Sequence, residues 1–336
     1  MEYRNLGRSG LMVSPLCIGT MLFGGLTNKK TADAILGSAR DAGINFIDSA
    51  SSYTGGKSES MVGELLAKDR DKWVLATKGG SPLGPGPYDR GISRKALMKF
   101  LDDSLKRLNT DYIDLYYLHK DEEDRGLEET VATVGDMIRS GKIRYWGISN
   151  YRGWRHVEVV HLADRLGVPR PAASQPYYNA MNRMPENDIL PACAHHGIGV
   201  VPYSPLARGV LTGKYDPKAA PDKDSRAGRE DRRMMETEFR PESLKMAQKI
   251  RKHAEKRGMT AVSFAFLWIL HNPIITAAVA GPRTLDHWKS YLEIFNHEFT
   301  AEDEALIDSM VPSGHPSTPG YNDPQYPILG RPTGAK

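Results

Sequence analysis

Hydrophobic residues along the chain fall into short, nearly continuous runs, and longer stretches of mixed polarity separate them. Eight of these runs have the length and composition of buried strands. They lie at residues 16–19, 45–49, 73–78, 113–119, 143–149, 172–175, 199–204 and 275–281. Strands that are apolar on both faces are typical of parallel sheets covered by helices, so the runs predict a parallel sheet.

The stretches between these runs show the spacing of amphipathic helices. One apolar stripe contains Leu97, Leu101, Leu105 and Leu108, and similar stripes occupy residues 127–138 and 244–254. Strands that alternate with helices in this way predict an α/β protein, and eight units favour a (β/α)8 TIM barrel. A doubly wound open sheet is the weaker alternative, because the sequence CIGTMLFGG does not give a convincing G-x-G-x-x-G fingerprint.

Three segments lie outside this repeat. Residues 2–15 alternate loosely around a Gly-Arg-Ser-Gly turn, which predicts a short N-terminal hairpin that closes one end of the barrel. The composition of residues 205–240, after the seventh strand, predicts a long structureless loop that is either functional or mobile. The barrel is expected to span residues 1–311. The Pro/Gly-rich tail at 312–336 carries Tyr321, Tyr326 and Ile328, so it either packs near the active site or frays as an ordinary terminus.

Composition narrows the functional classes. Hydrophobic residues make up 40% and charged residues 26% of the chain, as in globular proteins. The 45 basic and 41 acidic residues are too balanced for a nucleic-acid-binding surface. No apolar run approaches the about 18 residues of a membrane span, and the N-terminus lacks a signal core, so we expect a cytoplasmic protein. Cys17 and Cys193 lack metal-ligand spacing, which predicts buried thiols and no metal site.

Polar side chains stand where the predicted strands end. Asp48, Lys78 and His119 end the second, third and fourth strands, and Tyr53 follows the second. Singly, each has an ordinary explanation as a cap, a solvated charge or a rim histidine. Loops that follow barrel strands share one face, so together the residues predict a single site. There the positive charge of Lys78 is expected to lower the pKa of the Tyr53 phenol, and Asp48 to hold the lysine.

This set of groups predicts carbonyl reduction. A tyrosine can protonate a carbonyl oxygen while a histidine hydrogen-bonds it, and no serine or cysteine nucleophile is paired with a base. A hydride from a bound cofactor is then the natural reactant at the carbonyl carbon. A Schiff-base aldolase is the alternative enzyme class, in which Lys78 forms an imine with the substrate.

The segments NFIDSASSY, WVLATKGG and YIDLYYLHK resemble the motifs of the aldo-keto reductase superfamily, and the resemblance covers nearly the whole chain. It implies an (α/β)8 barrel, NADPH as the hydride donor, no metal, and a small-molecule carbonyl substrate. It also implies that Asp48, Tyr53, Lys78 and His119 form the catalytic tetrad, with Tyr53 as the general acid. The branch resembled includes glyceraldehyde reductases and potassium-channel β subunits. A cofactor-binding regulatory protein with little turnover is therefore a third alternative.

The resemblance also implies a cofactor site. Ser149, Asn150 and Gln175 correspond to the residues that hydrogen-bond the nicotinamide carboxamide, and Tyr203 to the aromatic residue that stacks on its ring. The segment SPLARGVLTGKY resembles the one that lies over the pyrophosphate, and Gly281-Pro282-Arg283 resembles the motif at the 2′-phosphate. The remaining expected cofactor contacts are Gly19, Thr20, Met21, Asp48, Ser204, Leu206, Arg208, Gly209, Lys214, Arg226, Gly281, Arg283 and His287.

Two features of the sequence bear on specificity. His287 and Tyr291 replace the glutamine and asparagine that the family usually carries beside the adenine, which puts the adenine contacts in doubt. The expected substrate-lining residues are Met21, Phe23, Tyr53, Tyr88, His119 and Trp146, with Tyr151, Tyr321 and Tyr326 as further aromatic candidates. The resemblance implies either a small aldehyde or a bulkier cyclic ketone, such as an oxidised mycotoxin, as substrate.

Overall fold

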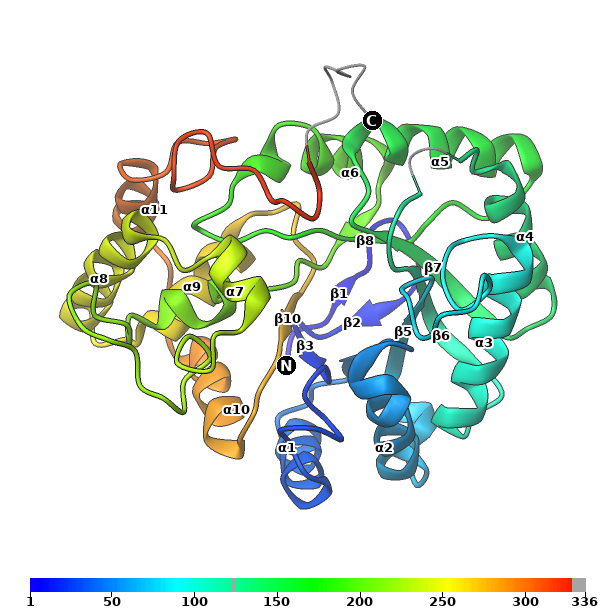
Figure 1. Ribbon diagram of the computed structural model, residues 1–336, viewed down its shortest axis with the longest axis horizontal. Coiled ribbons are helices and arrows are strands. Elements are labelled where there is room, and N and C mark those ends of the chain that lie inside the picture. The colour runs from blue at the N-terminus through cyan, green and yellow to red at the C-terminus, as the bar shows by residue number, and fades with distance from the viewer. Residues whose placement is uncertain (123–124, 328–336) are drawn as a thin grey trace.

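The computed structural model describes residues 1–122 and 125–327, and within them one eight-stranded parallel sheet curls into a barrel (Figure 1). The strand order is β10-β3-β4-β5-β6-β7-β8-β9. The barrel closes where the Thr276 amide donates to the Val200 carbonyl, at 2.9 Å. Each strand lies in a predicted run, so the barrel prediction is confirmed. The strands are β3 (Leu16–Gly19), β4 (Phe46–Asp48), β5 (Val74–Gly79), β6 (Ile113–Leu118), β7 (Ile143–Ser149), β8 (Ala173–Gln175), β9 (Gly199–Val200) and β10 (Ala278–Ala280).

The predicted N-terminal hairpin is also present, as the antiparallel strands β1 (Arg4–Asn5) and β2 (Met12–Val13). It lies at the amino-terminal ends of the barrel strands. There the Arg8 amide donates to the Gly197 carbonyl at 2.8 Å, and the Asn45 amide nitrogen donates to the Met12 carbonyl at 3.0 Å. The opposite end of the barrel stays available for the loops that follow the strands.

Helices surround the barrel, and their ends follow local signals. Ser93 begins α3 by accepting a hydrogen bond from the Ala96 amide, and Gly167 ends α5 in the left-handed conformation. The α-helices are α1 (Lys29–Asp41), α2 (Lys57–Leu66), α3 (Arg94–Leu108), α4 (Glu128–Arg139), α5 (Gly153–Leu166), α6 (Ile189–His196), α7 (Arg232–Thr237), α8 (Pro241–Lys256), α9 (Ala261–His271), α10 (Leu285–Leu292) and α11 (Ala301–Asp308). Short 3-10 turns are η1 (Tyr53–Gly56), η2 (Arg70–Lys72), η3 (Met184–Glu186), η4 (Ala207–Thr212) and η5 (Glu293–Asn296).

The core has two layers, because successive strand residues point to opposite faces of the sheet. Phe46 and Ala76 belong to the cluster inside the barrel, whereas Ile47 and Leu75 belong to the cluster between the barrel and the helices. Cys17 lies in the inner cluster, and both cysteines are buried free thiols, as predicted. This alternation decides which residues at the strand ends face the barrel axis.

The connection at residues 205–240 is more ordered than the sequence predicted. It contains η4 and α7, joined by turns, so the expectation of a structureless loop is corrected. Helix α7 begins after Asp231, whose carboxylate accepts a hydrogen bond from the Met234 amide at 2.9 Å. This local cap explains a short helix in a segment without sustained apolar periodicity.

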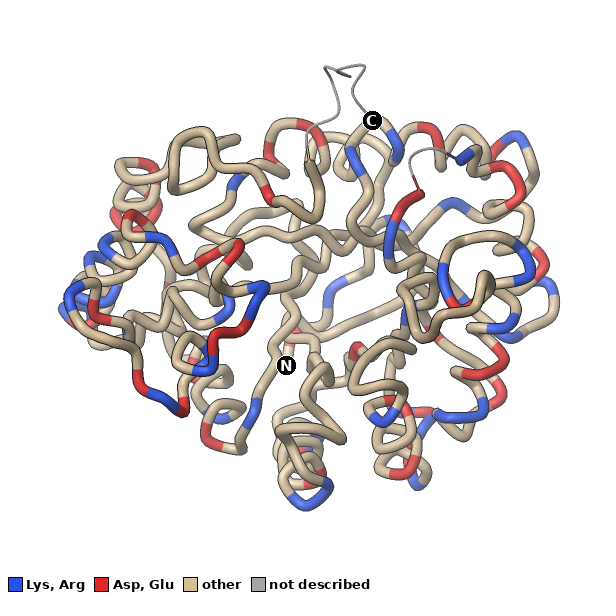
Figure 2. Tube along the Cα trace, viewed as in Figure 1, with Lys and Arg blue, Asp and Glu red and all other residues tan. Residues whose placement is uncertain are grey.

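The described part of the tail, residues 312–327, packs against the barrel, whereas Ile328 lies outside the described residues. The Ser317 amide donates to the Met181 carbonyl at 2.9 Å. Acidic and basic residues are interspersed over the outer helices and loops (Figure 2). Within residues 1–122 and 125–327, every helix is too short or too polar to cross a membrane.

Candidate active site

Four polar side chains meet at the carboxyl-terminal end of the barrel. Asp48 and Lys78 follow the inward-facing residues Phe46 and Ala76 by two positions, so both point to the barrel axis. His119 follows inward-facing Tyr117 in the same way. The Tyr53 ring lies edge-on to the His119 ring, with 6.1 Å between the ring centroids. Strand alternation therefore brings the predicted set into one place.

Lys78 lies at the centre of this cluster. Its ammonium group forms an ion pair with Asp48, donates to the Ser49 carbonyl at 2.7 Å, and donates to the Tyr53 hydroxyl at 3.0 Å. The Lys78 side chain is 0% exposed and that of Asp48 is 1% exposed. Gln175 donates to the second Asp48 oxygen at 3.0 Å. These bonds hold the buried pair in one geometry.

The electrostatics favour a charged lysine and a neutral tyrosine. Burial alone would lower the pKa of Lys78, but the Asp48 carboxylate and the Tyr53 phenol outweigh it and raise that pKa to about 12. Burial raises the pKa of Tyr53, and the opposing effect of the Lys78 charge is smaller. The prediction of a lowered tyrosine pKa is therefore wrong for the free protein, because desolvation outweighs the lysine. Tyr53 consequently carries its proton at neutral pH.

His119 is neutral for a related reason. Burial, and then the nearby Lys78 charge, lower the pKa of its imidazole to about 3. Its ring Nδ1 is buried and lacks a hydrogen-bond partner among the described residues, while its backbone carbonyl accepts from Asn150 at 2.9 Å. A neutral imidazole can donate one hydrogen bond to a ligand without bringing a charge.

A group of amides and hydroxyls adjoins the tetrad. Asn150 donates to the Ser149 hydroxyl at 3.0 Å and accepts from the Tyr203 hydroxyl at 2.8 Å. Ser149 donates to the Gln175 carbonyl at 2.9 Å. Asn150 has φ +63°, a conformation uncommon for residues other than glycine. All four residues expected at the nicotinamide therefore lie together beside Asp48.

The loop after β9 forms a turn with unusual backbone conformations. Ser204, Ala207 and Arg208 have φ +58°, +46° and +52°, and Gly209 has φ +101°. Successive residues of this kind turn backbone amides toward one side and create concavities that bind anions. The Lys214 ammonium would lie 3.9 Å from a Cβ built at Gly209. Leu206 supports the turn, since its carbonyl accepts from the Gly209 amide at 2.8 Å.

Further cations lie beyond this turn. Arg283 and His287, at the start of α10, lie close enough to each other and to Lys214 for both cations to lower the pKa of His287, after the larger effect of burial. Arg226 lies near Arg208 and pairs with Asp231 at 3.1 Å. Such a cluster suits a ligand with several phosphate groups, so the residues present fit the cofactor that the sequence implies.

Comparisons with known proteins agree with this geometry. Residues 15–312 match the Aldo/keto reductase family. The chain belongs to that family. It is 37% identical over 290 residues to a probable voltage-gated potassium channel subunit beta of Arabidopsis thaliana, covering 84% of this chain and 87% of the relative.

Two bacterial relatives match over more of the chain. The uncharacterized oxidoreductase YrpG of Bacillus subtilis is 35% identical over 330 residues, which are 95% of this chain and 98% of the relative. The L-glyceraldehyde 3-phosphate reductase of Escherichia coli K12 is 33% identical over 329 residues, which are 94% of this chain and 93% of the relative. This aldo/keto reductase is therefore an oxidoreductase of a family that acts on carbonyl compounds.

Three aromatic residues expected in the substrate pocket of this aldo/keto reductase lie elsewhere. Phe23, Trp146 and Tyr151 belong to the core cluster outside the barrel, with exposed fractions of 0%, 1% and 2%. Trp146 alternates with the inward-facing Tyr145 and Gly147 on β7, and its indole donates to the Pro169 carbonyl at 2.6 Å. Their placement as substrate contacts is thus corrected, because strand alternation or loop packing turns them toward the helices.

The other expected contacts on the ends and loops after β3 and β5 differ in how exposed they are to solvent. Thr20 is fully buried and donates to the Asp48 carbonyl at 3.0 Å, so it supports the tetrad from behind. Gly19 pairs with Asp48 across the sheet. Met21 and Tyr88 are 40% and 41% exposed on the loops after β3 and β5. Of these four residues, Met21 and Tyr88 are the two that a ligand can reach from solvent.

At the adenine end, Gly281 leaves open space, since a Cβ built there would meet only the Gly19 carbonyl, at 3.9 Å. Tyr291 is 6% exposed and its ring packs on Phe266, with 5.2 Å between centroids. Tyr291 is therefore part of the core under α10, and its difference from the usual family residue affects packing first.

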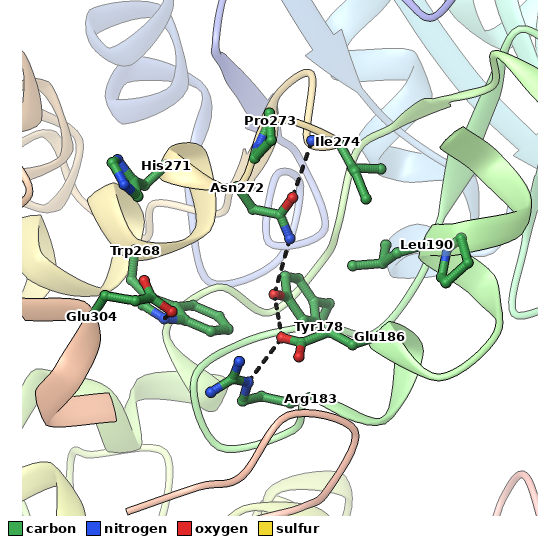
Figure 3. A pocket seen from close by; sticks show the side chains of 11 residues that line it. Tyr178, Arg183, Glu186, Leu190, Trp268, His271, Asn272, Pro273, Ile274 and Glu304 are labelled. Carbon is green, nitrogen blue, oxygen red and sulfur yellow. Dashed lines mark hydrogen bonds and ion pairs between the residues drawn. The ribbon is translucent and has the colours of Figure 1, made fainter. Parts of the chain in front are cut away.

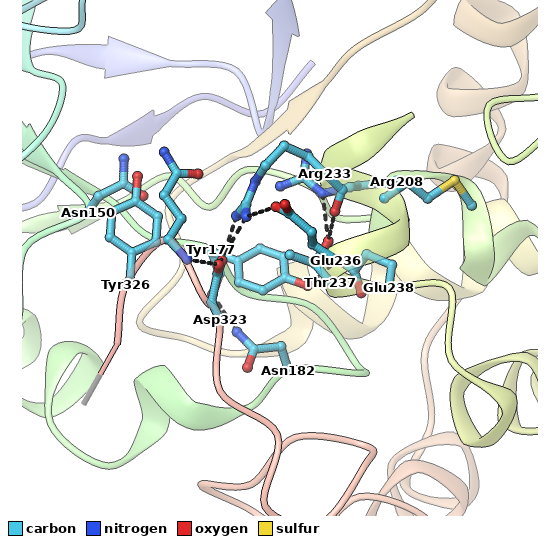
Figure 4. Close-up of polar contacts among 12 residues, drawn as sticks. Asn150, Tyr177, Asn182, Arg208, Arg233, Glu236, Thr237, Glu238, Asp323 and Tyr326 are labelled. Carbon is cyan, nitrogen blue, oxygen red and sulfur yellow. Dashed lines mark hydrogen bonds and ion pairs between the residues drawn. The ribbon is translucent and has the colours of Figure 1, made fainter. Parts of the chain in front are cut away.

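Sequence reasoning missed the contacts between the tail and the cofactor loop. Arg233 of α7 and Asp323 of the tail form a two-pronged ion pair at 3.0 and 2.6 Å (Figure 4). Arg152 donates to the Tyr326 and Pro327 carbonyls at 2.9 and 2.7 Å. Figure 4 shows Tyr326 beside Asn150. No local signal could reveal an ion pair whose partners are 90 residues apart.

The depressed pKa of His119 leads to a pH prediction. The unfolded chain takes up a proton at His119 near pH 6.5, whereas the folded chain resists it until about pH 3, so stability is lost as pH falls below 6.5. Between pH 7 and pH 5, this proton uptake should lower the free energy of unfolding of the wild type by about 2 kcal/mol. The His119→Gln variant should lack this decrease.

Urea unfolding at both pH values measures this difference. In NMR spectra of the histidine ring nitrogens, the signal that is absent from the His119→Gln variant belongs to His119. In the wild type, this signal should keep the chemical shifts of a neutral imidazole from pH 8 to pH 5. Titration of that signal near pH 6.5 would contradict the burial argument.

Proposed function

We propose that this aldo/keto reductase reduces an aldehyde or ketone to an alcohol with NADPH, and that Tyr53 supplies the proton. The observation that carries the proposal is the buried arrangement in which charged Lys78 donates to a protonated Tyr53 beside a neutral His119.

The tetrad residues divide the work. Tyr53 and His119 hydrogen-bond the carbonyl oxygen, which polarises the C=O bond. When bound, the cofactor would supply a hydride for the carbonyl carbon. The oxygen then takes the Tyr53 proton, and the phenolate left behind lies 3.0 Å from the Lys78 ammonium, which stabilises it. The lysine therefore acts on the phenolate as it forms, although burial keeps the free phenol neutral.

The cofactor region supports NADPH as the hydride donor. Ser149, Asn150 and Gln175 would hold the nicotinamide carboxamide, and Tyr203 would stack on its ring. The left-handed turn at Ser204–Gly209 and Lys214 would receive the pyrophosphate. Arg283, with Arg226 and His287 near, would meet the 2′-phosphate, for which a guanidinium is well shaped.

Fewer observations bear on the class of substrate and on the cellular compartment. Met21 and Tyr88 are exposed on the loops after β3 and β5, and we propose that they contact either a small aldehyde or a cyclic ketone such as an oxidised mycotoxin. The relative from Escherichia coli, named for L-glyceraldehyde 3-phosphate, supports the small aldehyde. We propose one catalytic domain at residues 1–311, in the cytoplasm.

The two alternatives to a reductase, an aldolase and a regulatory protein, are not equally supported. A Schiff-base aldolase needs a neutral lysine, and the raised pKa of Lys78 opposes it. A regulatory cofactor-binding protein is supported by the relative named as a potassium channel subunit. Tight NADPH binding without turnover of any carbonyl compound would favour this second alternative.

A spectrophotometric assay tests the proposal. Purified protein is mixed with NADPH or NADH and a panel of aldehydes and ketones of increasing size, and absorbance at the reduced-nicotinamide band is followed. We expect turnover with NADPH, and at least about tenfold weaker NADPH binding in Arg283→Ala, because a charge-assisted contact is lost. Lys218→Ala, which removes an exposed basic side chain from the connection after β9, is the control and should bind NADPH normally. Equal use of both cofactors by wild type and Arg283→Ala would contradict the phosphate assignment.

A further inference from the structure

A cavity lies on the flank of the barrel, among helices rather than at the strand ends (Figure 3). Its volume is about 380 Å³, within the range of small-molecule sites. It is lined from η3, α6, α9 and α11, and it shares no residue with the tetrad or the proposed cofactor site. The lining residues are Tyr178, Arg183, Glu186, Leu190, Trp268 and Glu304, with residues 271–274 and Pro191 at the edge.

One side of this flank pocket is a satisfied hydrogen-bond chain. The Asn272 amide donates to the Tyr178 hydroxyl at 3.4 Å, and this hydroxyl donates to Glu186 at 2.8 Å. Arg183 donates to Glu186 at 2.8 Å, to Asp308 at 2.6 Å and to the Val311 carbonyl at 2.9 Å. Two carboxylates neutralise Arg183 and a carbonyl occupies a further donor, so this guanidinium is not a free cation for an anionic ligand.

Glu304 is in the opposite situation. It belongs to no ion pair among the described residues, and its one side-chain hydrogen bond comes from the Trp268 indole at 3.3 Å. Burial, and then the nearby Asp308, raise the pKa of its carboxyl group, and the smaller opposing effects of Arg183 and His271 do not offset them. Within the described residues, the pocket wall thus contains an acid without a direct ion-pair partner.

The rest of the lining is aromatic or apolar. The Tyr178 and Trp268 rings pack together with 5.1 Å between centroids, and Leu190 and Ile274 face the same space (Figure 3). An aromatic wall attracts a cation as well as an apolar group. The combination of an unpaired carboxylate, an indole and aliphatic side chains complements a molecule with a positive head and a compact apolar body.

We propose that the flank pocket binds a small organic cation, a protonated amine on an apolar body, with its ammonium group on Glu304 and its body against Trp268 and Leu190. The amine would supply the hydrogen-bond donors and the counter-charge that Glu304 lacks. The site is separate from the carbonyl-reducing site, so it does not depend on the proposed function.

Isothermal titration calorimetry of the full-length protein tests this site. The probes are 2-phenylethylamine, its neutral analogue 2-phenylethanol and the anionic 3-phenylpropionate, which share a phenyl body and differ in the head group. We expect saturable binding of the amine, with a Kd at least about tenfold lower than that of either analogue, as a charge-assisted contact provides. Equal affinity for the amine and the alcohol overturns the proposal without any variant.

Two substitutions on α11 locate the binding. Glu304→Gln keeps an oxygen that can accept from Trp268, so the fold should be retained, yet the amine should bind about tenfold more weakly. Glu302→Gln removes the same charge from an exposed position on the same helix and should leave the Kd unchanged. An unchanged Kd in Glu304→Gln, or an equal loss in Glu302→Gln, rejects the site.

Tyr53→Phe provides the last control. The flank pocket lies apart from the tetrad, so this variant should bind the amine with the wild-type Kd. A lack of amine binding to the flank pocket and a lack of reductase activity are therefore detected in separate experiments.

Discussion

Replacing Tyr53 by phenylalanine is expected to lower kcat for carbonyl reduction by about 10²- to 10⁴-fold, which is the usual contribution of a general acid. The ring stays, so the packing against His119 and the shape of the site are kept. The proton donor and the group that Lys78 stabilises are removed together. Stopped-flow measurement of NADPH oxidation, with NADPH binding followed by fluorescence, separates chemistry from affinity, and the cofactor Kd should change little.

Tyr116→Phe is the matched control for this experiment. Tyr116 belongs to the cluster outside the barrel, and its buried hydroxyl lacks a hydrogen-bond partner among the described residues. Removing that hydroxyl should leave kcat unchanged and should cost no stability, because no bond is broken. Wild-type turnover in Tyr53→Phe, or an equal loss in Tyr116→Phe, would contradict the role of Tyr53.

The second large effect is expected from Lys78→Met. This change leaves the Asp48 carboxylate buried without its cation, which typically costs about 3–5 kcal/mol of unfolding free energy. It also removes the charge that stabilises the Tyr53 phenolate, so activity should be lost. Urea denaturation at pH 7 measures the stability, since the raised pKa of Lys78 keeps its contribution fully present below pH 10.5 and loses it only as pH rises through about 12.

Two further variants make the stability result specific. Adding Asp48→Asn to Lys78→Met removes the stranded charge, and the double variant should recover part of the lost stability while remaining inactive. Lys29→Met breaks the pair between Lys29 and Glu64, whose side chains are 62% and 60% exposed, and should leave the free energy of unfolding nearly unchanged. If Lys78→Met and Lys29→Met cost the same, the buried pair does not stabilise the fold.

Much of the fold could be predicted from local pattern. Each barrel strand lies within a predicted run, because strands buried on both faces need continuous apolar sequence. The second strand and its acid followed from Asn45–Ser49, and the helix start at Ser93 from its side chain. The strand after residue 199 is shorter than predicted, and the structure confines it to Gly199–Val200. Boundaries depend on pairing with neighbours, which local pattern does not contain.

The part of the candidate site that could be predicted from the sequence consists of residues in recognisable motifs and at strand ends. Asp48, Lys78 and His119 each end a strand, and the structure brings them together with Tyr53 as expected. Period-two alternation was also present in the sequence and would have turned Trp146 away from the pocket, since Ser149 and Trp146 stand three positions apart on β7 and so face opposite sides. That error came from weighing residue type above strand geometry.

The sequence by itself determined the order of the elements, the barrel, and the identity of the groups at its mouth, because these depend on local periodicity and on side-chain chemistry. Only the tertiary structure decided how those groups are charged. Desolvation outweighs the Lys78 charge and keeps the Tyr53 proton in place, and the balance of desolvation against a neighbouring charge exists only in the folded chain. The Arg233–Asp323 pair and the unpaired Glu304 likewise arise from contacts between distant segments, which no local pattern records.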